Sequence, residues 1–166
     1  CSSDLFELFG IPIQLRVDTA ALRPRFFELS RQFHPDFYVN RSAEEQTMAL
    51  EKTAQLNKAW KIFQQSDELL RYVLEIHGQW QLGEKHELSP EFLMEMMEIN
   101  EALMDADGDD QGSLRRQLKD IEASILEPVK PYFTESPFIA NPEKLVKLKE
   151  YYYRRKYIQR IEDQLT

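Results

Sequence analysis

The chain has 166 residues, and its 29 Asp and Glu against 21 Lys and Arg give a formal net charge of −8 at pH 7. No apolar run approaches the roughly 18 residues that a membrane-spanning helix needs, and the acidic charge disfavours diffuse binding to nucleic acid. A single cysteine excludes an intrachain disulfide scaffold. With 42% apolar and 30% charged residues, the composition is that of a folded soluble protein rather than a disordered one.

The chain starts at Cys1 rather than at a methionine. This residue is either the trimmed end of a longer chain or the lipidated residue of a lipoprotein, and we favour the trimmed end because no signal segment is visible. One free cysteine without an export signal is typical of a reducing compartment. We therefore expect a cytoplasmic protein, or a protein of the mitochondrial matrix if its source is eukaryotic.

The five glycines all fall where helical periodicity breaks. Residues 78–83 interrupt two helical patterns, which predicts a linker over residues 78–89. The linker separates a predicted N-terminal domain over residues 1–77 from a C-terminal domain over residues 90–166. The sequence has no useful period-2 alternation, no hairpin dipeptide and no internal repeat, so the predicted fold is all-α.

A short apolar turn over residues 5–9 opens the N-terminal domain and ends at Gly10. Asp18 is then predicted to cap a helix that carries apolar residues at helical spacing. Pro24 lies inside this helix, where its ring displaces a backbone hydrogen bond, so we expect a local kink or a later start. The helix is predicted to stop at residues 34–36, because a residue before proline disfavours the α conformation. Its predicted buried face consists of Leu22, Phe26, Leu29 and Phe33.

Two further helices complete the predicted N-terminal domain. One runs from Ser42 to Phe63, and the other runs from Asp67 to His77 and ends at Gly78. The predicted buried side of the first consists of Met48 or Ala49, Leu56, Ala59, Trp60 and Phe63. The apolar residues of the second are Leu70, Val73, Leu74 and Ile76.

The C-terminal domain contains helical patterns separated by short polar or proline-containing segments. Its predicted elements are a helix over residues 90–105 opened by Ser89 and Pro90, a loop over residues 107–112, a helix over residues 113–133 with a break near Pro128 and Pro131, and a helix over residues 141–164. Helices of this length with short connections predict an antiparallel three-helix bundle.

The tripeptide His34-Pro35-Asp36 lies between two amphipathic helices. Its simplest interpretation is a surface turn in which the proline ends one helix and the aspartate caps the next. The preceding helix carries three arginines beside its apolar stripe, namely Arg23, Arg25 and Arg31. These arginines are a local positive feature that suits steering toward an acidic partner, although ordinary solvated surface charges are the alternative interpretation. Because two of them lie six residues apart, the basic patch would have to be broad.

The helix over residues 90–105 has more apolar surface than a small bundle can bury. One face, suited to the core, consists of Phe92, Met96, Ile99 and Leu103. The adjoining faces carry Leu93, Met94, Met97 and Met104, and Glu98, Glu101 and Asp105 lie along their edge. A methionine-rich patch rimmed by carboxylates is typical of a protein-binding surface. The alternative is that the methionines fill the core and the acidic residues are simply solvated.

The negative charge is concentrated in one segment. Residues 84–110 contain ten acidic residues against Lys85, a local net charge of −9, whereas the rest of the chain has a net charge of +1. This distribution predicts two protein partners of different charge at the two ends of the molecule.

Enzyme and metal-binding patterns are weak. Residues 105–116 begin like a calcium-binding loop, but Asp110 stands where glycine is needed and Arg116 stands where a bidentate glutamate is needed. The three histidines have no metal-ligand spacing with one another or with Cys1. No nucleophile has a placed base, and no glycine-rich phosphate loop occurs. We therefore expect no enzyme activity, no metal site and no cofactor.

Several segments together match the pattern of one family. The first set is Leu5-Phe6-Glu7-Leu8-Phe9-Gly10, Arg25-Phe26, Arg31-Gln32-Phe33-His34-Pro35-Asp36 and Leu56-Asn57-Lys58-Ala59-Trp60. The second set is Tyr72-Val73-Leu74 with His77-Gly78, and Phe92-Leu93-Met94-Glu95. Through the first set the chain resembles the J-domain family of co-chaperones. Through the second it resembles the HscB subfamily, which serves iron–sulfur cluster assembly, and the resemblance covers nearly the whole chain.

The resemblance implies an adaptor rather than a catalyst. Its J-domain would dock on a DnaK/HscA-class chaperone ATPase and stimulate ATP hydrolysis, and its C-terminal bundle would hold an IscU-type iron–sulfur scaffold protein. The implied chaperone-binding residues are His34, Pro35, Asp36, Arg23, Arg25 and Arg31. The implied scaffold-binding residues are Leu93, Met94, Met97, Glu98, Glu101, Asp105 and Tyr157, with Tyr151, Tyr152 and Tyr153 as alternatives to the last. The other hypothesis is a generic J-domain protein whose C-terminal bundle binds another client or dimerises. Neither hypothesis includes a nucleic-acid or membrane partner.

Overall fold

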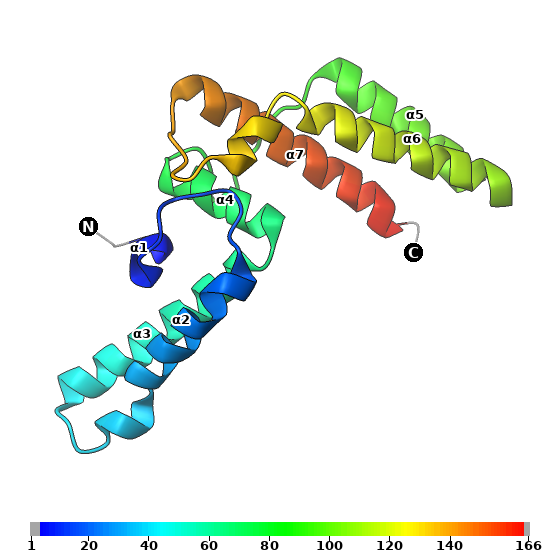
Figure 1. The fold of residues 1–166 in the computed structure, drawn as a ribbon. Coiled ribbons are helices and arrows are strands. Elements are labelled where there is room, and N and C mark those ends of the chain that lie inside the picture. The colour runs from blue at the N-terminus through cyan, green and yellow to red at the C-terminus, as the bar shows by residue number, and fades with distance from the viewer. Residues whose placement is uncertain (1–3, 165–166) are drawn as a thin grey trace. The chain divides into compact units, whose positions relative to one another are not determined.

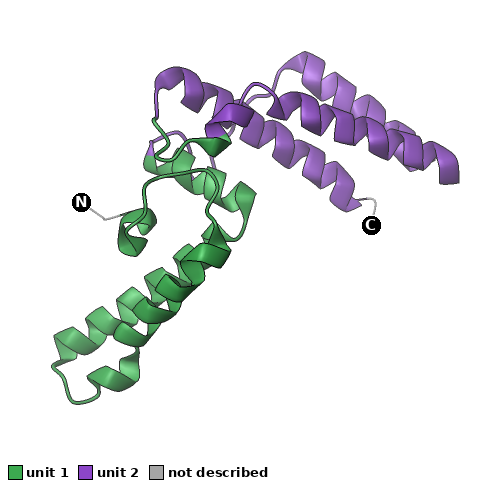
Figure 2. Ribbon diagram, viewed as in Figure 1, with its two compact units in different colours: residues 1–76, 133–139 green, residues 77–132, 140–166 purple. Residues whose placement is uncertain are grey.

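The computed structural model describes residues 4–164, so Cys1 and the two interpretations of it lie outside the described residues. The described part of the chain contains helices and no strands, which confirms the all-α prediction. Within the described residues it divides into two compact units, residues 4–76 with 133–139 and residues 77–132 with 140–164 (Figure 2). No helix in this part of the chain is long and apolar enough to cross a membrane.

The first unit is built around a helical hairpin (Figure 1). Its elements are α1 (Leu5–Phe9), α2 (Thr19–Gln32), the 3-10 helix η1 (Pro35–Tyr38), α3 (Ala43–Phe63) and α4 (Ser66–Ile76). The Asp18 side chain accepts a hydrogen bond from the amide of Ala21, and the Ser42 side chain accepts one from the amide of Glu45, so both long helices start at a side-chain cap. The prediction of a later start for α2 is wrong, because this cap fixes the start at Thr19 and Pro24 lies within the helix.

Aromatic rings form much of the core of the first unit. The Phe63 ring lies 5.4 Å from the Phe6 ring and 5.2 Å from the Phe9 ring. The Tyr72 hydroxyl accepts a hydrogen bond of 2.8 Å from the amide of Leu5, which joins α4 to α1. These contacts explain why the short α1, marginal alone, is stable here.

The predicted buried face of α3 is largely correct, and that of α2 is correct in part. Leu22 and Leu29 are buried, whereas Phe26 and Phe33 are half-buried. In α3 the buried residue near the start is Ala49 rather than Met48, which decides between the two alternatives. Trp60 is half-buried, and its ring stacks on the ring of Phe26 at 4.6 Å.

Residues 133–139 belong to the first unit although they lie far along the chain (Figure 2). The amide of Phe138 donates a 2.7 Å hydrogen bond to the carbonyl of Ile13, and the guanidinium of Arg16 lies 5.2 Å from the centre of the Phe133 ring. Both phenylalanines are buried. The predicted division at residues 78–89 does not place residues 133–139 in the first unit. Their place there depends on contacts between residues more than a hundred positions apart, which the sequence pattern does not show.

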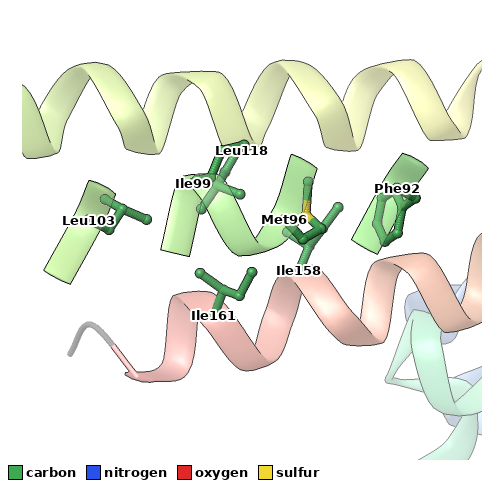
Figure 3. Close-up of a cluster of buried hydrophobic side chains, with 7 residues drawn as sticks. All are labelled: Phe92, Met96, Ile99, Leu103, Leu118, Ile158 and Ile161. Carbon is green, nitrogen blue, oxygen red and sulfur yellow. The ribbon is translucent and has the colours of Figure 1, made fainter. Parts of the chain in front are cut away.

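The second unit contains three α-helices, and consecutive ones run in opposite directions (Figure 1). They are α5 (Pro90–Asp105), α6 (Gly108–Leu126) and α7 (Pro142–Gln164), and the 3-10 helix η2 (Lys130–Thr134) follows α6. Their side chains meet in one apolar cluster (Figure 3), which consists of Phe92, Met96, Ile99, Leu103, Leu118, Ile158 and Ile161. The predicted three-helix bundle is therefore confirmed.

The predicted loop over residues 107–112 is wrong, because α6 already begins at Gly108. Asp109 and Asp110 lie in the first turn of α6, where carboxylates interact favourably with the positive end of the helix dipole. The predicted break near Pro128 is correct, since α6 ends at Leu126.

Candidate functional site

The tripeptide of residues 34–36, called the HPD turn below, lies at the start of η1 between α2 and α3. The His34 ring caps η1, because its Nδ1 accepts a 3.2 Å hydrogen bond from the amide of Asp36. Pro35 occupies the first position of η1, where its fixed φ suits a helix start. The Asp36 side chain is 85% exposed, and its Oδ2 lies 3.6 Å from His34 Nδ1. At this exposure Asp36 presents its carboxylate to solvent.

The exposed side of α2 next to the HPD turn has a hollow with basic and apolar walls. The lining residues are Ala20, Arg23, Pro24, Phe27, Ser30, Arg31 and His34. Phe27 is 55% exposed and lies four residues from each of two arginines, Arg23 and Arg31, so all three share one helical stripe. Arg25 is not part of this hollow, and its guanidinium lies 3.4 Å from the Glu28 carboxylate.

The structure therefore brings Arg23, Arg31 and His34 to one surface and leaves Arg25 outside it. The predicted chaperone-binding set does not include Phe27. This residue lies next to Phe26 of the predicted buried face, and an aromatic residue in such a place is ordinarily expected in the core. Its spacing of four residues from both arginines was the available signal.

The two faces of α5 differ as predicted. Phe92, Met96, Ile99 and Leu103 are buried in the bundle core (Figure 3). The neighbouring face exposes Met94 by 63%, Met97 by 55% and Met104 by 74%. The alternative that Met94 and Met97 fill the core is wrong.

The other α5 residues of the predicted scaffold-binding set lie beside these methionines. Leu93 is half-buried, and the three carboxylates are exposed, namely Glu98, Glu101 and Asp105. The result is an apolar surface with an acidic edge, called the methionine face below. Such a surface suits a partner with an apolar patch and basic residues around it.

On α7, Tyr157 is half-buried and packs against the core cluster that α5 contributes to. Its ring lies 6.2 Å from the Phe92 ring in a T-shaped arrangement. Of the alternatives, Tyr152 is buried and Tyr153 donates a hydrogen bond to Glu84. The position of Tyr157 beside α5 supports its place in the proposed surface.

A polar network that sequence reasoning missed joins the segment before α5 to α7. Lys149 Nζ and the Tyr153 hydroxyl both donate to the Glu84 carboxylate, the tyrosine at 2.9 Å. His86 stacks on the Tyr153 ring at 4.5 Å, and its Nε2 lies 2.7 Å from the Glu150 carboxylate. The Lys149 hydrogen bond lowers the pKa of Glu84, whereas burial and the bond to Glu84 raise the pKa of Tyr153 to about 12. The network fixes the chain just before the methionine face.

The C-terminal part matches a family model. Residues 88–166 match the model described as the HSCB C-terminal oligomerisation domain. A Vibrio cholerae protein named co-chaperone protein HscB homolog is 31% identical over 166 residues, which cover 96% of this chain and 97% of the relative. The chain belongs to the HscB co-chaperone family. A relative of the same name from Vibrio atlanticus is 40% identical over 107 residues, and this match spans only 63% of the length of either chain.

Solved HscB structures share this fold. Human co-chaperone protein HscB matches with a TM-score of 0.76 and 28% identity, over 99% of this chain and 81% of the human chain. Chaperone HscB from Vibrio cholerae matches with a TM-score of 0.63 and 28% identity, over 99% of this chain and all of the other. The predicted HscB membership, with a J-domain followed by a C-terminal helical domain, is confirmed.

Proposed function

We propose that this HscB-family chain stimulates the ATPase of a DnaK/HscA-class chaperone and delivers an IscU-type iron–sulfur scaffold protein to it for cluster transfer. The observation that carries the proposal is the presence of two unlike exposed surfaces in different units. One combines the HPD turn with a basic stripe on α2, and the other is the acidic methionine face on α5. In this proposal residues 1–77 act as the J-domain, residues 78–89 as the linker and residues 90–166 as the scaffold-binding domain. The proposed location is the cytoplasm, or the mitochondrial matrix in a eukaryote.

The HPD turn and the α2 stripe are the proposed contact with the chaperone ATPase. The exposed Asp36 carboxylate is suited to pair with a basic group, and the guanidiniums of Arg23 and Arg31 are suited to an acidic surface. Phe27 between the two arginines adds an apolar anchor of the kind that often dominates binding energy. In this proposal Arg25 has a lesser role, because it lies outside this stripe.

The chaperone contact is tested with Asp36→Asn, which keeps the shape of the side chain and removes its charge. We expect an unchanged melting temperature and a loss of ATPase stimulation. Asp120→Asn is the matched control, because Asp120 is exposed on α6 and outside both proposed surfaces. Full stimulation by Asp36→Asn would contradict the proposed contact.

The methionine face is the proposed contact with the scaffold protein. Methionine side chains adapt to irregular partners, and covering them removes apolar surface from water. The carboxylates of Glu98, Glu101 and Asp105 at the edge favour a partner with basic residues in register. Tyr157 would extend this surface onto α7.

The scaffold contact is tested with the double variant Leu93→Ala/Met97→Ala in calorimetric titrations. We expect weaker scaffold binding, with ATPase stimulation in the absence of scaffold left intact. Leu82→Ala/Val146→Ala removes two exposed apolar side chains outside α5 and is the matched control. Unchanged scaffold affinity in the α5 variant would show that this face is wrongly assigned.

A second candidate function is a J-domain protein whose C-terminal bundle dimerises. It is favoured by one observation, the description of the matching family model as an oligomerisation domain. Sedimentation equilibrium of the full chain, with and without the scaffold protein, separates the two. A concentration-dependent dimer that excludes the scaffold would favour dimerisation, and a complex of one chain with one scaffold would favour the adaptor.

A further inference from the structure

The HPD turn lies between the end of α2 and the start of α3, where backbone carbonyls have no partner within a helix. Three side chains outside the tripeptide donate hydrogen bonds to carbonyls on both sides of it, namely Thr53, Tyr38 and Gln46. We propose that these three are positioning residues, which hold the HPD turn in the conformation that binds the chaperone ATPase. This inference rests on the proposed function of the turn.

Thr53 fixes the residue directly before the turn. Its hydroxyl donates a 3.0 Å hydrogen bond to the carbonyl of Phe33, across twenty positions of the sequence and in a partly buried place. A threonine inside a helix ordinarily donates to the carbonyl four residues earlier. Thr47 in the same helix does so, with a bond of 2.9 Å to Ala43. The hydroxyl of Thr53 therefore joins α3 to the end of α2 instead of serving its own helix.

Tyr38 links the two sides of the turn, and Gln46 fixes the side after it. The Tyr38 hydroxyl donates a 3.2 Å hydrogen bond to the carbonyl of Gln32, so the last residue of η1 is tied to the last residue of α2. The side-chain amide of Gln46 donates to the carbonyls of Val39 at 3.2 Å and Arg41 at 3.0 Å. Carbonyls on both sides of the tripeptide are thereby held from α3 or η1.

These contacts restrict the backbone of the turn, whereas the side chains of His34 and Asp36 remain exposed. A partner that binds one conformation of a flexible turn loses affinity in proportion to the fraction of molecules in other conformations. Holding the ends of the turn raises the fraction that is ready to bind, without adding any contact to the partner. Loss of one of these hydrogen bonds is therefore expected to raise the concentration of the chain that gives half-maximal ATPase stimulation. The maximal stimulation is expected to stay the same.

The test measures the ATPase rate of a DnaK/HscA-class chaperone against the concentration of the full-length chain. Thr53→Val removes the hydroxyl and keeps the shape of the side chain. We expect it to raise the concentration for half-maximal stimulation about three- to tenfold, with a maximal rate near that of the unaltered chain. Thr53→Ser restores the hydroxyl and is expected to restore half-saturation. Thr47→Val is the matched control in the same helix and is expected to have no effect.

An unchanged half-saturation in Thr53→Val, an equal loss in Thr47→Val, or a Thr53→Ser chain as weak as Thr53→Val would each overturn the inference. If Thr53→Val does not fold, Tyr38→Phe takes its place, because it removes one exposed hydrogen bond and keeps the ring. It is expected to raise half-saturation about two- to fivefold, and no change would overturn the inference. An unaltered chain that fails to stimulate the ATPase would instead overturn the proposed function.

Discussion

Substitution of two adjacent methionines tests whether α5 has one buried core face and one exposed binding face. Met96 has no exposed surface and lies in the bundle core (Figure 3). Met97, by contrast, is 55% exposed on the methionine face. The same substitution at the two positions therefore has different consequences. Met96→Ala leaves a cavity and is expected to lower the free energy of unfolding by about 2–5 kcal/mol, and Met97→Ala by less than about 0.5 kcal/mol.

Scaffold binding is expected to respond in the opposite order. Complete burial of a methionine side chain contributes about 1.5–3 kcal/mol, and covering a side chain that is 55% exposed contributes roughly half of that. Met97→Ala is therefore expected to weaken scaffold binding about four- to twelvefold, whereas Met96→Ala leaves the affinity of the folded chain nearly unchanged.

Urea unfolding followed by far-UV circular dichroism measures the free energy of unfolding. Calorimetric titration with the scaffold protein measures the binding affinity. An equal loss of stability in both variants would refute the orientation of α5. Unchanged affinity in Met97→Ala would refute the role of the methionine face.

The other predictions concern the polar network and the grouping of residues 133–139. Because the pKa of Glu84 is lowered, its contribution to stability is present above the ordinary pKa of a glutamate and is lost as the pH falls below that value through the lowered pKa. Glu84→Gln should therefore destabilise the chain at pH 7 and much less in acid, as measured by urea midpoints across pH. The raised pKa of Tyr153, to about 12, predicts stability that is present below pH 10 and lost between about pH 10 and 12, and Tyr153→Phe should flatten this alkaline loss. Phe138→Ala should lower the free energy of unfolding by about 3–5 kcal/mol. Because Phe138 is buried in the first unit, hydrogen exchange of the backbone amides should become faster in α1 to α4. Faster exchange confined to α5 to α7 would contradict that grouping.

Local patterns in the sequence were sufficient for the helices and for the core face of α5. Asp18 and Ser89 cap helices where expected, because capping depends on residues within one turn. The spacing of Phe92, Met96, Ile99 and Leu103 predicted their burial for the same reason.

Features that depend on distant contacts could not be predicted. The hydrogen bond between Phe138 and Ile13 and the network around Glu84 join residues far apart in the sequence, and no periodicity marks them. The early start of α6 was missed because the glycines and aspartates of residues 107–112 are typical of loops, although aspartates also suit a first helical turn. The hydrogen bond from Thr53 to Phe33 could not be predicted either, since a threonine inside a helix is expected to bond to a carbonyl of the same helix.

The most direct test of the adaptor is the steady-state ATPase rate of the chaperone with this chain, with the scaffold protein, and with both. The account predicts that the chain alone stimulates the rate and that adding scaffold raises it beyond the sum of the separate effects. A rate with both proteins that equals the rate with the chain alone would contradict the adaptor role, and no stimulation by the chain would contradict the function of the HPD turn.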